Sequence, residues 1–271
     1  MTLSDQDNPN RGIYNTKYSG REMSLDGARM PYDNEMINLR LELLRRYGHD
    51  KITLDLCCGT GSYLRRAWGR FPRAVGLDFS RKMLQVFTEE LGGDIPDNLL
   101  LLEGDARRIA LRSGSMDFVF SFTSLYHVPQ VSLAVAEIGR ILKAGGLAVL
   151  EMGNRWSLNT LVSARAHRRQ GFAKPFHVSC PAMFGMIRNA GLTIREHRCF
   201  HLLPMWGGGP VWLRPLTDWR WKWIMGIKIG GRLLDEWLSS SWPWRYLAFR
   251  HLFVCQKIGK SEEETDDDRQ K

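Results

Sequence analysis

Short apolar runs alternate with amphipathic stretches along most of the chain, and this alternation predicts strands separated by helices. The predicted strands are 51–56, 73–78, 99–104, 117–121, 147–151, 193–200 and 247–258. The predicted helices are 35–47, 129–143 and 181–190. Such an order is typical of a mostly parallel sheet with helices on both faces. The sequence therefore predicts a doubly wound α/β fold.

A glycine-rich turn follows the first predicted strand and reads Asp55-Leu-Cys-Cys-Gly59-Thr-Gly61. Glycine has no Cβ, so the backbone can turn sharply here and lie close to a ligand. The second strand ends at Asp78, 17 residues after Gly61. In nucleotide-binding folds, an acid at this place accepts hydrogen bonds from two ribose hydroxyls. The pattern predicts a ligand with an adenosine-like end.

Two common nucleotide motifs do not fit this turn. The dinucleotide fingerprint G-x-G-x-x-G requires a third glycine where Leu64 stands. The P-loop requires Gly-Lys-Ser/Thr after the turn, and that sequence is absent. The sequence therefore disfavours both classes of ligand.

Five segments resemble, in order, the motifs of class I S-adenosylmethionine-dependent methyltransferases, including the branch that methylates quinone carbons. They are 55–61, 75–84, 101–106, 115–128 and 137–150. The family usually has glycine where Cys57 stands. The resemblance covers about 51–154. It implies a Rossmann-like sheet with an antiparallel last strand and S-adenosylmethionine as cofactor.

The same resemblance assigns the cofactor-binding residues. In relatives, an acid at the tip of the third strand contacts the adenine amino group, and Asp105 takes that place here. Ser80 is placed to cap the helix that follows the second strand. The cofactor-binding residues predicted in this way are Asp55, Cys57, Gly59, Thr60, Gly61, Asp78, Phe79, Asp105, Ala106 and Ser121.

His127, on the loop after the fourth strand, is the first candidate for a catalytic base. A hydroxyl acceptor must lose a proton, and histidine is suited to accept it near neutral pH. A packed or capping histidine is an equally good interpretation. Tyr126 beside it is a candidate acceptor-binding residue, and His167, His177 and His201 are lesser candidates for the base.

Eight of the ten tryptophans lie in segment 203–246. Together with 153–178, this segment is predicted to form a lid over the site, and the chain around Tyr14 and Tyr18 is a candidate to close it. Trp219, Trp221 and Trp223 are the predicted acceptor-binding residues. Three other interpretations stay open: the lid's own core, a nucleic-acid stacking surface, and a membrane-surface belt.

Composition bounds the remaining possibilities. Residues 1–258 are predicted to form one domain, with its core at about 35–202 and 247–258. The acidic tail 259–271 has no apolar side chain to bury and is predicted to be disordered. The net charge is +9, of which the tail contributes −3, so the rest carries +12. Five cysteines without a C-x-x-C pair predict a reducing, cytoplasmic location and no metal site. No apolar run is long enough to span a bilayer.

These observations together predict a methyltransferase that acts on a small-molecule or lipid-like acceptor at an oxygen atom. Carbon methylation of a quinone-type ring is the enzyme alternative. An RNA methyltransferase or a catalytically silent S-adenosylmethionine-binding protein are the others. Nucleic acid is not an expected partner, because no recognised RNA-binding motif accompanies the positive charge. Peripheral membrane contact stays open.

Overall fold

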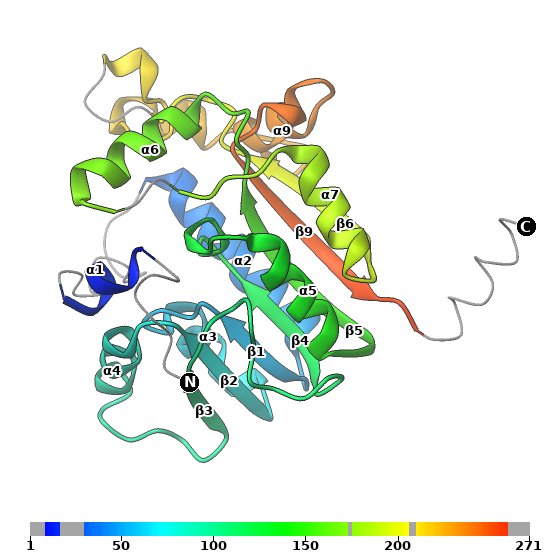
Figure 1. The fold of residues 1–271 in the computed structure, drawn as a ribbon. Helices are drawn as coiled ribbons and strands as arrows, with labels where there is room; N and C mark the ends of the chain where they lie inside the picture. Colours follow the sequence, from blue (N-terminus) through cyan, green and yellow to red (C-terminus); the bar gives the residue numbers. More distant parts are fainter. Residues whose placement is uncertain (1–8, 17–29, 173–174, 206–209, 260–271) are drawn as a thin grey trace, which may run out of the picture.

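The structure is a computed structural model that describes residues 9–16, 30–172, 175–205 and 210–259. Seven strands form one sheet in the order β3-β2-β1-β4-β5-β9-β6 (Figure 1). Their bounds are β1 Ile52–Leu56, β2 Arg73–Asp78, β3 Leu99–Glu103, β4 Met116–Ser121, β5 Leu142–Gly153, β6 Leu192–Phe200 and β9 Arg250–Lys257. Strands β1 to β5 pair in parallel, whereas β9 runs antiparallel to both β5 and β6. The predicted fold class, including the antiparallel last strand, is confirmed.

Helices cover both faces of this sheet. Apolar side chains of α2 (Pro31–Gly48), α3 (Ser62–Ala67) and α4 (Arg81–Glu90) pack in one buried cluster. Those of α5 (Val131–Ile141) and α7 (Cys180–Asn189) pack in the cluster on the opposite face. The helices bury the apolar side chains on the side that faces the sheet, as expected for amphipathic helices. The two layers hold the carboxyl ends of the parallel strands together at one edge.

Several element bounds differ from the predicted ones for identifiable reasons. Helix α2 begins four residues early because Pro31 stands at its first position, where proline needs no amide hydrogen. Segment 203–246, for which no strand was predicted, contains a hairpin of β7 (Lys228–Ile229) and β8 (Arg232–Leu233). Gly230 and Gly231 both take positive φ at its turn, as a two-residue hairpin turn of type I′ requires. Short helices α8 (Lys222–Met225) and α9 (Leu234–Ser240) flank this hairpin.

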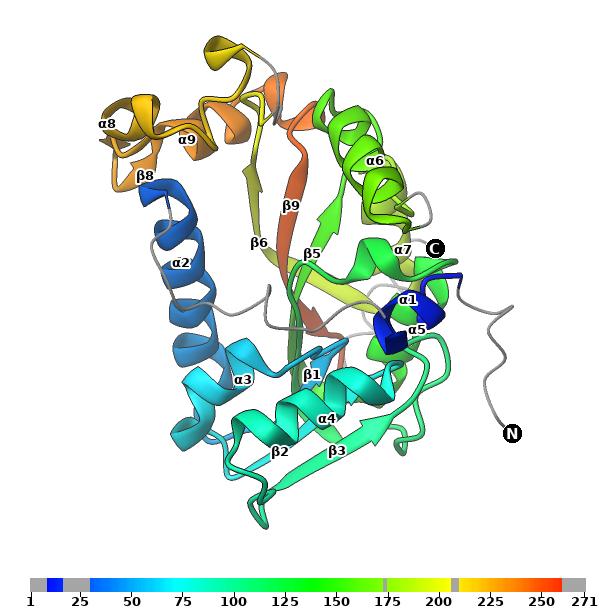
Figure 2. The same ribbon diagram turned by 90° about the vertical axis from the view of Figure 1, so that its left-hand side faces the viewer.

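The two segments predicted as a lid lie at the carboxyl edge of the sheet. Helix α6 (Asn159–Gln170) comes from the first, and α8 and α9 come from the second (Figure 1, top). Figure 2 shows α8 and α9 beside the start of α2. A buried carboxylate fastens them there: Asp235 accepts hydrogen bonds from the Tyr32 hydroxyl and the His201 amide, both at 2.6 Å.

Some expectations fall outside the described residues or stay predictions. Tyr18, Trp206 and the tail 260–271 lie outside the described residues. The lid and domain boundaries stay predictions. Among the described helices, none has the length and apolar character needed to cross a bilayer.

Candidate cofactor and acceptor site

The turn between β1 and α3 is held in a conformation that side chains resist. Gly59 and Gly61 have φ of 55° and 69°, and Cys57 has φ of 60°. A Cβ at Gly61 would stand 2.1 Å from the Phe87 ring, so no larger residue fits there without movement. The left-handed backbone at Cys57 also explains why the resembled family usually places glycine at this position.

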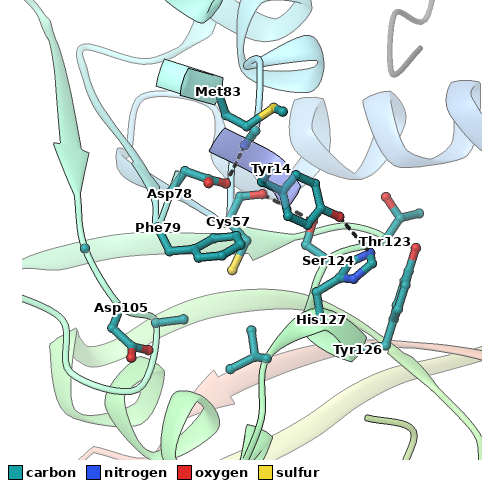
Figure 3. A pocket seen from close by; sticks show the side chains of 14 residues that line it. Tyr14, Cys57, Asp78, Phe79, Met83, Asp105, Thr123, Ser124, Tyr126 and His127 are labelled. Carbon is teal, nitrogen blue, oxygen red and sulfur yellow. Dashed lines mark hydrogen bonds between the residues drawn. The ribbon is translucent and has the colours of Figure 1, made fainter. Parts of the chain in front are cut away.

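Asp78 joins the tip of β2 to this turn. Its carboxylate accepts hydrogen bonds from the amide of Gly59 (Figure 3) and from that of Ser80, each at 2.9 Å. The residue is 4% exposed, and burial raises the pKa of its carboxyl to about 6, although these amides act in the opposite direction. Each carboxylate oxygen keeps further acceptor capacity. The carboxylate is therefore able to accept hydrogen bonds from a diol.

A cavity of about 130 Å³ opens beside Asp78. Phe79, Met83, Ala106 and Val128 give it apolar walls. Asp105 stands on its rim, where Arg107 donates two hydrogen bonds to the same carboxylate oxygen, at 2.9 and 2.5 Å. Burial alone would raise the pKa of Asp105, but the hydrogen bonds and charge of Arg107 outweigh it and lower that pKa. The cavity thus combines apolar walls with two acids.

Aromatic side chains and His127 form the far end of this cavity. Tyr14, from α1 (Arg11–Thr16), has its hydroxyl 3.2 Å from His127 Nε2 (Figure 3). Tyr126 lies against His127 with ring centroids 4.3 Å apart. Burial, followed by the charges of nearby histidines and Arg250, lowers the pKa of His127 to about 3. The imidazole is therefore neutral at physiological pH and only weakly basic.

A second cavity, of about 270 Å³, lies on the other side of the turn. It shares Cys57, Thr123 and Ser124 with the first cavity, so the two spaces adjoin. Asp55 lines it, and burial together with the charge of Asp78 raises the pKa of Asp55 well above its usual value. Its other walls are partly apolar and partly charged, from Asp33, Met36, Ile37, Arg40, Cys58, Thr60, Ser62, Tyr63, Phe122 and His201.

A buried ionic chain underlies this second cavity. Arg40 donates to both oxygens of Glu151, at 2.9 and 3.1 Å, and to the Tyr63 hydroxyl at 2.9 Å. The Arg250 Nε lies 3.8 Å from Glu151, and its guanidinium carbon lies 4.2 Å from the centroid of the Tyr126 ring. These two arginines and one glutamate carry a net positive charge, and the Arg250 guanidinium packs against the Tyr126 ring. Sequence reasoning missed it, although an acid ending an apolar strand at Glu151 was a signal.

The structure brings most of the predicted site residues to these two cavities. The first is lined by Cys57, Gly59, Asp78, Phe79, Asp105, Ala106, Tyr126 and His127. The second is lined by Asp55, Cys57 and Thr60. Gly61 shapes the turn from behind, and the buried Ser121 lines neither cavity. The three predicted acceptor-binding tryptophans, Trp219, Trp221 and Trp223, also line neither cavity.

Comparisons with known proteins agree with this site. Residues 54–150 match the family model described as a methyltransferase domain. Over 99 residues, the chain is 37% identical to a demethylmenaquinone methyltransferase of Staphylococcus aureus. That match covers 35% of this chain and 40% of the relative, so the chain spans less than half the length of the curated relatives it matches.

Solved structures extend the similarity of fold over most of the chain. A putative methyltransferase of Haloferax volcanii, solved with the Trm112 activator, gives a TM-score of 0.59 at 18% identity and covers 93% of this chain and 97% of that one. Magnesium protoporphyrin IX methyltransferase of Synechocystis, solved with bound SAH, gives 0.59 at 12% identity, covering 91% and 97%. Motifs and matches together identify residues 54–150 as a methyltransferase domain of the class I S-adenosylmethionine-dependent type, and the rest of the chain shares the fold of such enzymes.

Proposed function

We propose that the protein transfers a methyl group from S-adenosylmethionine to a small-molecule acceptor. The observation that carries this proposal is the buried Asp78 carboxylate, fixed by the turn amides on the wall of the first cavity. Asp78 would accept both ribose hydroxyls, and Phe79 and Ala106 would bound the adenine ring. The rim acid Asp105 would face the adenine amino group. This donor and acceptor set fits the cofactor.

The basicity of His127 bears on which acceptor fits. When bound, S-adenosylmethionine supplies an already activated methyl group, so the protein must chiefly align the acceptor. A neutral imidazole whose pKa is about 3 removes a proton poorly from an ordinary alcohol. A ring hydroxyl or a carboxyl group ionises far more readily and needs less help. We therefore place the transfer at an acidic oxygen, with Tyr14, Tyr126 and His127 as contact residues.

Carbon methylation of a quinone-type ring is the second candidate. The curated relatives are named demethylmenaquinone methyltransferases, which favours it. A reduced quinone ring also carries acidic hydroxyls, so the same weakly basic site would serve it. Apolar side chains of the second cavity, including Met36, Ile37 and Phe122, are suitable neighbours for a ring with an apolar substituent.

The decisive measurement follows the methyl group. Protein supplied with carbon-13-methyl S-adenosylmethionine and phenolic, carboxylic or reduced quinone acceptors should yield a methylated product. The carbon-13 shift of that product separates an O-methyl from a C-methyl group. Asp78→Asn is the matched variant and should need more cofactor for the same rate. Calorimetry that showed nicotinamide dinucleotide binding and no S-adenosylmethionine binding would overturn the proposal. If the protein methylated RNA and none of the small molecules, the acceptor would be RNA and the proposed small-molecule acceptor would be wrong.

The exposed surface of the lid supports a lipid-like acceptor. Ten of the exposed large apolar side chains among the described residues lie between 212 and 247, and Trp223 and Trp242 are 80% and 76% exposed. Lys222 sits against the rings of Trp219 and Trp223, 5.9 and 5.2 Å from their centroids. Tryptophans interleaved with cations are typical of segments that lie in the interface of an anionic membrane. We propose that this face docks on such a surface and that the acceptor comes from it.

Vesicle sedimentation tests the docking face. The double variant Trp223→Ala/Trp242→Ala should partition into phosphatidylglycerol-containing vesicles at least about tenfold more weakly, because a buried ring contributes roughly 1.5–3 kcal/mol. Leu100→Ala, at a half-exposed site on β3, is the control and should bind as the wild type does. Trp221 is unsuitable for this test because its indole donates to the Val211 carbonyl at 3.0 Å within the lid. Equal partition of all three proteins would disprove docking through these rings.

A further inference from the structure

Two histidines and two cysteines gather on the face of the sheet that α7 covers, away from both cavities. His197 and Cys199 lie two residues apart on β6, so they share a face of that strand. Cys199 pairs directly across the strands with His251 of β9. Cys180 stands in the first turn of α7. Three of the four are buried, and His197 is partly exposed.

The ligand atoms of His197, Cys199 and His251 lie close to one another, and the Cys180 sulfur lies beside His251. Cys199 Sγ lies 3.4 Å from His197 Nε2 and 3.7 Å from His251 Nδ1. The two imidazole nitrogens are 2.9 Å apart. Cys180 Sγ is 4.0 Å from His251 Nδ1. All ligand atoms of the first three residues fall within 4.8 Å of one another.

These separations are close to those of a tetrahedral zinc site. Bond lengths of about 2.3 Å to sulfur and about 2.0 Å to nitrogen place neighbouring sulfur and nitrogen ligands about 3.5 Å apart and two nitrogens about 3.3 Å apart. The observed sulfur–nitrogen distances bracket the first value. The two nitrogens would have to separate by about 0.4 Å. We propose that His197, Cys199 and His251, with Cys180 as the fourth ligand, bind one Zn²⁺ ion.

The surroundings of the cluster suit a metal. His251 Nε2 lies 3.3 Å from the Ala248 carbonyl, so its N–H bond points there and the lone pair of Nδ1 faces the cluster. The Phe253 ring stacks on His197 at 4.4 Å, and Phe184 meets the same imidazole edge-on. These rings shield the ligands, while the partly exposed His197 leaves a route of entry. Two thiolates would balance the charge of Zn²⁺.

The ligand set has a structural role rather than a place in methyl transfer. None of its members lines either cavity. Strand β6 is at the end of the sheet and pairs there only with β9 among the described strands. A metal held by β6, β9 and α7 would fasten this edge strand and its covering helix together. Structural zinc sites with four protein ligands act in this way.

The experiment compares two buried thiols in the whole protein. Wild-type protein, expressed with zinc and dialysed, should retain about one zinc ion per chain by elemental analysis. With Co²⁺ in place of zinc, it should show the thiolate-to-metal charge-transfer band of a tetrahedral site. Cys199→Ser should weaken the band, because only the Cys180 thiolate then remains, and it should bind metal at least about tenfold more weakly. Cys255→Ser changes a buried thiol on β9 outside the cluster and should keep both properties.

Three results would overturn the proposal. The first is wild-type protein that holds no zinc and gives no cobalt band. The close contacts between His197, Cys199 and His251 would then be hydrogen bonds only. The second is a Cys180–Cys199 disulfide found by mass spectrometry in protein prepared without oxidant. The third is metal retained equally by Cys199→Ser and Cys255→Ser, which would place the ion elsewhere. If Cys180→Ser bound the metal as tightly as the wild type, Cys180 would not be a ligand.

Discussion

The raised pKa of Asp78 makes cofactor binding depend on pH in a predictable direction. Only the ionised carboxylate accepts hydrogen bonds from both ribose hydroxyls with full strength. Burial places the pKa of this carboxyl at about 6 in the free protein. Cofactor affinity should therefore increase as the pH rises through 6 and become constant above about 7.

The size of the effect follows from the same pKa. At pH 5, one unit below the pKa, only about one carboxyl in ten is ionised. The dissociation constant should then be about tenfold higher than its plateau, a difference of about 1.4 kcal/mol. Calorimetric titration with S-adenosylhomocysteine from pH 5 to pH 8 measures this directly.

Two variants assign the titration to Asp78. Asp78→Asn should bind more weakly and show no step near pH 6. Asp55→Asn is the control, because it changes the other buried acid of this turn and leaves the Asp78 carboxyl and its hydrogen bonds in place. Asp55→Asn should thus keep the step. A wild-type affinity that is flat between pH 5 and pH 8, or a step that survives in Asp78→Asn, would refute the reasoning.

Three further predictions concern His127, the glycine turn and the N-terminal cap of α4. His127→Asn should keep turnover within about tenfold of the wild type, because an imidazole of pKa about 3 is a poor base. A loss of turnover of about a hundredfold at saturating acceptor would instead show that His127 acts as the catalytic base. Gly61→Ala should lower the free energy of unfolding by about 2–4 kcal/mol, because the new Cβ would clash with Phe87 and the φ is unfavourable for alanine. Gly114 has a similar φ but lies in open space, so the control Gly114→Ala should lower the free energy of unfolding by only about 1–2 kcal/mol. Equal losses in urea denaturation would rule out the contact with Phe87. Ser80→Ala should cost about 1 kcal/mol, because its hydroxyl caps α4 by accepting from the Met83 amide; an unchanged urea midpoint would show that this cap contributes nothing.

Local sequence patterns were sufficient to predict the sheet and the cofactor turn. The parallel strands contain short apolar runs, Asp78 is the last residue of β2, and Asp105 follows the end of β3 by two residues. The structure places both acids beside the cavity that Gly59 helps to line. These features depend on residues that are neighbours in the sequence, so the local pattern of apolar and polar residues is enough to predict them.

Features that depend on contacts between distant segments were not predictable in this way. Arg40 and Glu151 are 111 residues apart, and helical spacing alone does not show that Arg40 is buried. The cluster of His197, Cys199 and His251 requires the register of two antiparallel strands. Likewise, the tryptophan content of the lid does not reveal which rings face solvent. Packing decides that, and it leaves Trp223 outside.

The position of β9 has a consequence for folding during translation. This strand is the last of the described strands along the chain, yet it lies between β5 and β6 in the sheet. While the ribosome is still synthesising the lid, β5 has an open edge and β6 has no strand to pair with. Unpaired edges of this kind favour association between nascent chains. The C-terminal part of the sheet thus closes only when 250–257 emerge, and chaperones that cover exposed strands would act in this interval.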